Sequence, residues 1–117
     1  GDGDLDIITN DFNSAPLVLF SDLSTKRDVC YLQVALEGTR SNRDGLGAIV
    51  TVHVGTQRYM KCHDGQSGYL SQSSAPLYYG LDDAQVVDRI EVRWPSGKTQ
   101  VVPGPIKIGR TLTIREE

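Results

Sequence analysis

The chain has 117 residues, 12 basic and 15 acidic side chains, and a formal net charge of −3 at pH 7. This length suits one domain with a real core plus a short extra segment, and it leaves no room for a second full domain. The charge balance provides no basic surface for nucleic acid, and no apolar stretch approaches the roughly 20 residues of a membrane-spanning helix.

The first residues read as part of an aspartate-rich calcium loop, Gly1-Asp2-Gly3-Asp4-Leu5-Asp6. Calcium takes about 6 to 8 oxygen ligands, which such loops supply from alternate positions around a glycine turn. Asp2, Asp4 and Asp6 are the candidate metal ligands, in a loop that is incomplete here. Thr9 stands where an EF-hand places its bidentate Glu, which excludes the helix–loop–helix form. We expect calcium in a longer parent protein and no tight calcium binding by this part alone.

The rest of the chain has the pattern of strands. Glycine and proline recur too often for an ordinary amphipathic helix, while apolar residues alternate with period 2. In chain order, strands are expected at residues 6–9, 17–21, 30–36, 48–54, 57–63, 89–94, 98–102 and 111–115. We expect a chain break at 103–105 and a single helical turn starting at 82–84. About nine short strands in roughly 110 residues predict an all-β, antiparallel two-sheet β-sandwich, with a barrel as the alternative.

Two cysteines, Cys30 and Cys62, both fall in expected strands. They lack the C-x-x-C spacing of a metal site. Two interpretations stay open: an inter-strand disulfide formed in an oxidising compartment, or two small buried hydrophobic residues.

Two polar loops contain the candidate ligand-binding residues. In the first, residues 41–47, the candidates are Asn42, Arg43 and Asp44. The second, residues 65–74, concentrates hydroxyls, amides and one tyrosine without any charge, and its candidates are Ser67, Tyr69, Ser71 and Gln72. Uncharged hydrogen-bonding groups beside an aromatic ring suit a carbohydrate or a peptide backbone. Both loops also suit a structural role, in which Asx turns and glycines shape the backbone and the polar groups satisfy one another.

The histidines give a weaker, catalytic alternative. His53 and His63 are expected on neighbouring strands, where a turn at residues 55–56 would draw them together. With Asp64 they make a thin metal set, and with a serine of residues 67–74 they make the pair that a hydrolase needs. The G-x-S-x-G elbow of such enzymes is absent, and neighbouring Cys62 and His63 point to opposite faces of a strand. We therefore expect no enzyme, and a hydrolase or enzyme subunit is the alternative.

Four stretches share a further pattern: residues 38–48, 67–73, 79–81 and 87–97, which include the blocks Asn-Arg-Asp-Gly-Leu-Gly and Trp-Pro-Ser-Gly. In this order they resemble the ASPIC/UnbV domain, a family that includes cartilage acidic protein 1 and large bacterial proteins. The resemblance extends from about Cys30 to Ile114. It marks no catalytic residue.

The resemblance also implies a context. The family places this domain directly after FG-GAP or VCBS repeats, which are the aspartate-loop units of β-propellers. Residues 1–23 resemble the end of such a repeat, which implies a β-hairpin left over from a propeller blade, followed by an ASPIC/UnbV-like β domain in residues 24–117. By that comparison Asp2 and Asp6 occupy carboxylate positions and Asp4 offers its carbonyl. The resemblance implies an extracellular or envelope location.

We therefore expect a non-catalytic accessory or recognition domain at the C-terminus of a calcium-stabilised extracellular β-propeller protein. Its expected role is adhesion or the binding of a carbohydrate or an extracellular protein, and its other partners are the upstream repeats. A purely structural propeller cap is the alternative. The hairpin should also fold back on the domain or pair as strands with a second copy, because it lacks apolar neighbours for Ile7, Ile8, Leu17, Leu19 and Phe20.

Overall fold

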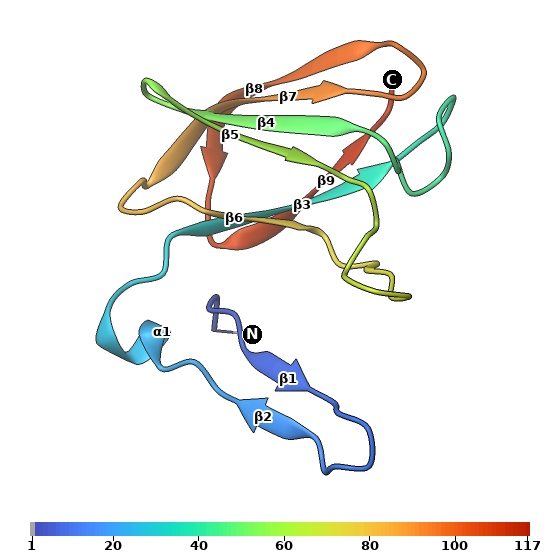
Figure 1. Ribbon diagram of the computed structural model, residues 1–117. Coiled ribbons are helices and arrows are strands. Elements are labelled where there is room, and N and C mark those ends of the chain that lie inside the picture. The colour runs from blue at the N-terminus through green and yellow to red at the C-terminus, as the bar shows by residue number, and fades with distance from the viewer. Residues whose placement is uncertain (1) are drawn as a thin grey trace.

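The computed structural model describes residues 2–117 and consists almost entirely of strands (Figure 1). Strands make up 47% of the described residues and helix 3%, which confirms the predicted all-β class. Within residues 2–117, no helix is long and apolar enough to cross a membrane. The elements are β1 (Ile7–Thr9), β2 (Leu17–Leu19), α1 (Leu23–Lys26), β3 (Tyr31–Glu37), β4 (Ile49–Val54), β5 (Gln57–Cys62), β6 (Leu77–Gly80), β7 (Val86–Arg93), β8 (Thr99–Lys107) and β9 (Arg110–Arg115).

Two sheets form the predicted sandwich. One has four strands in the order β5-β4-β7-β8, and the other has three in the order β6-β3-β9. Neither sheet closes into a barrel in the part of the chain that the structure describes. The period-2 pattern puts alternate side chains of each strand into the space between the sheets, where removal of apolar surface from water stabilises the fold. The buried core consists of Leu32, Val34, Ala48, Val50, Val52, Tyr79, Leu81, Val87, Ile90, Val92, Trp94, Ile106 and Ile114.

One strand pair departs from the expected antiparallel arrangement. β3 pairs antiparallel with β6 but parallel with β9, with Leu32 opposite Arg110 and Glu37 opposite Arg115. Parallel partners need a long crossover connection, and here the chain passes through the whole four-stranded sheet between them. Alternation of apolar residues specifies which face is buried, and it does not encode strand direction.

The expected chain break at residues 103–105 lies inside β8. The register between β7 and β8 shifts between Val87 and Arg89, which makes a bulge at this point. A Cβ added to Gly104 would lie 2.1 Å from the carbonyl oxygen of Asp88, so this close approach of two backbones requires glycine. The two prolines therefore bend the strand at a bulge and do not end it.

The single helical turn expected at residues 82–84 was a wrong prediction. The chain makes a hydrogen-bonded turn there, in which the Ala84 N–H donates to the Leu81 carbonyl over 2.9 Å, and Asp82 has φ 54°. The short helix is α1 instead, and β6 is a strand that the sequence pattern did not predict.

The predicted N-terminal hairpin is present and lies apart from the sandwich (Figure 1). β1 and β2 pair antiparallel in a two-stranded sheet of their own. All side chains of both strands are exposed, including Ile8 at 71%. The two strands thus do not fold back on the domain, and pairing with a second copy stays a prediction.

Candidate functional site

The loop from Gly38 to Gly47 connects β3 to β4 and is held by its own backbone. The Gly38 N–H donates to the Arg43 carbonyl over 2.9 Å. The Asn42 side chain bridges the loop, because its Nδ2 donates to the Leu46 carbonyl over 2.7 Å and its Oδ1 accepts the Leu46 N–H over 2.8 Å. Both ends of this amide are in use, so Asn42, predicted as a ligand-binding residue, shapes the loop instead.

Gly45 fixes this loop against the core. Its φ is +68°, and an added Cβ would lie 2.8 Å from the Leu36 Cβ and 3.3 Å from a ring carbon of Trp94. The tight contact requires a residue without a side chain in a left-handed conformation. Arg43 and Asp44, the other two candidates of this loop, are exposed.

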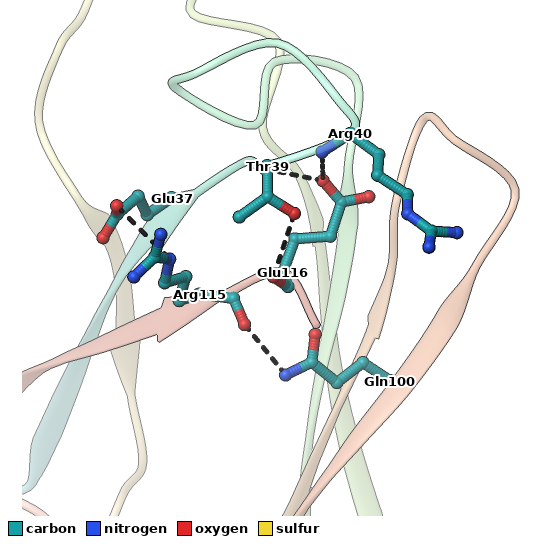
Figure 2. Close-up of polar contacts among 6 residues, drawn as sticks. All are labelled: Glu37, Thr39, Arg40, Gln100, Arg115 and Glu116. Carbon is teal, nitrogen blue, oxygen red and sulfur yellow. Dashed lines mark hydrogen bonds and ion pairs between the residues drawn. The ribbon is translucent and has the colours of Figure 1, made fainter.

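A buried carboxylate that sequence reasoning missed anchors the start of the loop. Glu116 is only 3% exposed, and the N–H groups of Thr39, Arg40 and Ser41 all donate to its Oε2. Figure 2 shows the bonds from Thr39 and Arg40. Burial alone would raise the pKa of Glu116, but these bonds and one from the Ser96 hydroxyl outweigh it and hold the pKa well below its ordinary value. No local sequence pattern around Glu116 indicates that this glutamate binds the loop.

Residues 65–74, the second polar loop, form a projecting loop whose two ends are bonded to each other. We call this loop the finger. The Ser73 N–H donates to the Gly65 carbonyl over 2.7 Å, and Gln66 and Gln72 form a β-bridge above it. The finger therefore has a fixed base from which its tip projects.

Within the finger, the Ser71 hydroxyl donates to the Ser67 carbonyl over 2.6 Å, so these two predicted residues bond each other. At the tip, Tyr69 is 93% exposed and Leu70 is 90% exposed. The ring of Tyr69 is therefore free to meet a ligand.

Between the two loops lies a cavity of about 480 Å³. Of the predicted ligand-binding residues, it contains Asp44 and Gln72, while Asn42, Arg43, Ser67, Tyr69 and Ser71 lie outside its lining. Carboxylate, amide, imidazole and hydroxyl groups alternate with small apolar surfaces around it. The lining is Ala35, Leu36, Asp44, Leu46, His63, Asp64, Gly65, Gln72, Ser73, Ser74, Ala75 and Pro76.

The structure separates the two histidines. The His63 N–H donates to the Ala48 carbonyl just before β4, whereas His53 lies near the other end of that strand, opposite Arg58. Five residues of strand separate the two positions by about 16 Å. The expectation that the strand turn draws His53 and His63 together was therefore wrong, and His63 alone lies in the cavity, with Ser73 and Ser74.

The aspartate loop contacts the start of α1 and the residue Ser21 before it. Asp6 Oδ1 accepts the Ser21 N–H and Asp4 Oδ2 accepts the Ser24 N–H, both over 2.9 Å, while Asp2 Oδ2 accepts the Ser24 hydroxyl over 3.0 Å. The bond from the Ser24 backbone lowers the pKa of Asp4. Gly1 of the predicted loop lies outside the described residues.

These three carboxylates supply only part of a calcium site. Among residues 2–117, no group of three His, Cys, Asp or Glu side chains has the arrangement of a metal site. The remaining Asp4 oxygen, Oδ1, is buried without a hydrogen-bond partner, as an oxygen left for a cation would be. The loop thus suits calcium only if further ligands come from elsewhere.

The same loop packs on the sandwich through two tyrosines. Tyr31 of β3 and Tyr78 of β6 stack with ring centroids 5.6 Å apart. The Tyr78 hydroxyl donates to the Gly3 carbonyl over 2.5 Å, and an added Cβ on Gly3 would lie 2.4 Å from the Tyr31 ring. A side chain at position 3 would break this contact.

Both cysteines are free. Cys30 lies just before β3 and is half-buried, while Cys62 ends β5 and is exposed. The disulfide is therefore not formed, and the buried interpretation fails for Cys62.

Comparison with known proteins places most of the chain in one family. The model of the family described as ASPIC and UnbV matches residues 38–117, which is more than half of the chain. No curated protein matches it. The match begins after β3, although β3 is the central strand of the three-stranded sheet, so the sandwich includes residues upstream of the matched region.

Proposed function

The chain belongs to the ASPIC and UnbV family, and we propose that its sandwich is a non-catalytic recognition domain that binds a carbohydrate between its two polar loops. The observation that carries this proposal is the cavity of about 480 Å³. Ligand-binding pockets typically have volumes of about 300–1,000 Å³, so a sugar ring or two fits.

The chemistry of the lining favours a ligand rich in hydroxyl groups. Asp44 and Asp64 offer carboxylate acceptors, and Gln72, with the hydroxyls of Ser73 and Ser74, both donates and accepts. Small apolar surfaces from Leu46, Ala75 and Pro76 lie between them and suit the C–H faces of a sugar. An extended peptide offers fewer donors for the two carboxylates.

The finger adds an aromatic platform beside the cavity. Tyr69 is almost fully exposed on a loop whose base is closed by the Ser73–Gly65 hydrogen bond. A rigid, exposed ring contributes apolar contact at small entropic cost, because only two side-chain angles have to be ordered.

A glycan array followed by titration calorimetry tests the proposal. We expect Gln72→Ala and Tyr69→Ala each to weaken binding at least about tenfold, equivalent to roughly 1.4 kcal/mol, with the melting temperature unchanged. Phe12→Ala is the matched control, because Phe12 is an equally isolated aromatic, 88% exposed, on the distant hairpin. Absence of any bound glycan, or equal losses in all three variants, would refute the proposal.

The domain's setting is part of the proposal. We propose that it follows calcium-stabilised propeller repeats in a protein located outside the cell or in its envelope, as an adhesion module. The aspartates at positions 2, 4 and 6 and the family membership support this. Protection of the full-length protein from external protease in intact cells would contradict that location, and a melting temperature that does not respond to calcium would contradict the calcium-stabilised repeats.

We propose a non-catalytic role because only one of the two histidines of the hydrolase alternative, His63, shares the cavity with Ser73 and Ser74. His53 lies on β4, far from His63, which follows β5, and the Nε2 of His53 is buried without a hydrogen-bond partner among the described residues. A base must lie within hydrogen-bond reach of the group it activates, so His53 does not activate a serine of residues 67–74.

A second function, a structural cap of the preceding repeats, is favoured by the contact of Gly3 with Tyr31 and Tyr78. Here the sandwich would stabilise the upstream repeats by covering their last unit. Comparison of the melting temperature of the full-length protein with and without residues 24–117 separates the two functions. A cap predicts that the upstream repeats melt several degrees lower without the sandwich, whereas a recognition domain predicts no change.

A further inference from the structure

The Glu116 carboxylate occupies a complete binding site made of five donors. Its Oε2 accepts the N–H groups of Thr39, Arg40 and Ser41 over 2.9, 2.8 and 2.7 Å. Its Oε1 accepts the hydroxyls of Ser41 and Ser96 over 2.9 and 2.6 Å. The two ion pairs among residues 2–117 join Lys26 to Asp22 and Arg115 to Glu37, so hydrogen bonds, and not an ion pair, stabilise this buried carboxylate.

Successive backbone N–H groups that point at one oxygen form a nest, a concave site for anions. This nest is preorganised, because Gly38 places residues 39–41 by packing against the Asn42 carbonyl, 2.0 Å from where a Cβ would be. The five donors carry no net charge, so their fixed directions, which match the two oxygens of a carboxylate, determine what the site binds.

We propose that Thr39, Arg40, Ser41 and Ser96 form a preorganised oxyanion-binding site that Glu116 fills as an internal ligand, so that the segment after β9 acts as a clasp. The chemical class of ligand is a small carboxylate. The site joins three separate segments: the β3–β4 loop, the β7–β8 turn and the residues after β9, which lie at one end of the sandwich (Figure 1). Both sheets are held together there.

Additional hydrogen bonds hold the clasp, the residues around Glu116, in position. The Thr39 hydroxyl donates to the Glu116 carbonyl over 3.1 Å, and the Glu116 N–H donates to the Glu37 carbonyl over 2.8 Å. On the other side, Gln100 Nε2 donates to the Arg115 carbonyl over 3.0 Å, as Figure 2 shows. Backbone contacts therefore hold Glu116 at the nest even when its carboxylate is removed, which leaves an empty oxyanion site in an otherwise intact fold.

The single tryptophan reports on this site. Trp94 Nε1 donates to Gln100 Oε1 over 2.9 Å, and the same Gln100 binds the residue before Glu116. Loss of the Glu116 carboxylate should therefore change the fluorescence of Trp94, because Gln100 links the only indole in the chain to the residue before Glu116.

Chemical rescue tests the proposal in the 117-residue chain. We expect Glu116→Ala to lower the melting temperature by on the order of 10 °C in chloride, because five buried donors lose their acceptor. Acetate or formate, compared with chloride at equal ionic strength and neutral pH, should restore a large part of that loss in the variant and leave the native protein unchanged. Rescue that is no greater with acetate than with chloride overturns the proposal.

A control variant and a refolding experiment complete the test. Glu117→Ala is the matched control, since Glu117 is exposed and only its carbonyl is bonded, by Lys98; no loss and no rescue are expected. If Glu116→Ala does not fold in chloride, refolding of the same variant is compared in acetate and in chloride. Recovery of the native Trp94 spectrum in acetate but not in chloride supports the proposal, and recovery in neither salt overturns it.

Discussion

The β1–β2 hairpin and the β4–β7 ladder of the sandwich are built from the same kinds of residues but differ completely in burial. Ile8 in β1 is 71% exposed, whereas Ile90 in β7 is fully buried. Backbone pairing needs only a neighbouring strand, while burial needs a second layer. Full burial of such a side chain contributes about 1.5–3 kcal/mol, so the sandwich holds nearly all the stability and the hairpin adds little.

Truncation of one isoleucine in each region gives the largest expected contrast. Ile90→Ala should lower the free energy of unfolding by about 2–5 kcal/mol through lost burial and a cavity, and Ile8→Ala should change it by less than about 0.5 kcal/mol. Urea unfolding followed by the fluorescence of Trp94 measures both. Equal effects would mean that the hairpin is part of the sandwich's cooperative unit.

Acid should act on the sandwich through Glu116. Because its pKa is lowered in the folded state, the stabilisation is complete above the ordinary glutamate value of about 4.3 and is lost as pH falls from there toward the lowered pKa. We expect the melting temperature of the native chain to fall steeply below about pH 4 and that of Glu116→Gln to be lower but flatter. Calorimetry across this range checks it, and parallel curves for the two proteins would assign the acid sensitivity to other carboxylates.

A comparison of two glycines in the sandwich distinguishes the cost of an unfavourable backbone conformation from the cost of a steric clash. Gly45 and Gly55 both have positive φ, but only Gly45 has neighbours that an added Cβ would meet. Gly55→Ala should cost about 1 kcal/mol from its conformation, and Gly45→Ala about 2–3 kcal/mol, because Leu36 must also shift. Chemical denaturation of both variants provides the comparison. An equal cost would show that the β3–β4 loop adjusts freely.

The smallest effect is expected where the two regions meet. Tyr78→Phe removes the hydrogen bond to the Gly3 carbonyl, which contributes about 0.5–1.5 kcal/mol to holding the aspartate loop on the sandwich. Global unfolding should hardly change, while limited proteolysis between residues 7 and 20 should become faster. A lower unfolding midpoint with unchanged proteolysis would place Tyr78 in the core's stability instead.

The sequence predicts the buried positions well because burial follows a local rule. Within the expected strands 48–54 and 89–94, the alternating residues Val50, Val52, Ile90 and Val92 are all fully buried. The parallel pairing of β3 with β9 could not be read in this way, since it joins segments far apart in the sequence. The direction of β9 and its pairing with β3 are determined by packing of the whole sandwich.

The candidate site was predicted in part for the same reason. Asp44 and Gln72 lie in the cavity because polar residues in adjacent loops face the same space. Asn42 bonds its own loop, which matches the structural interpretation of Asx residues. Glu116 was missed because its nest is formed by residues 39–41, and no local pattern connects these to a glutamate at the other end of the domain.

The pairing of β3 with β9 has a consequence for synthesis on the ribosome. The nascent chain emerges at about 5–20 residues per second, and neighbouring strands such as β4 and β5, or β7 and β8, can pair as soon as they appear. β3 is made early but stays with an open edge until β9 has been translated. A chain that stalls before Arg110 would therefore display an unpaired strand, which quality-control proteases and chaperones can recognise.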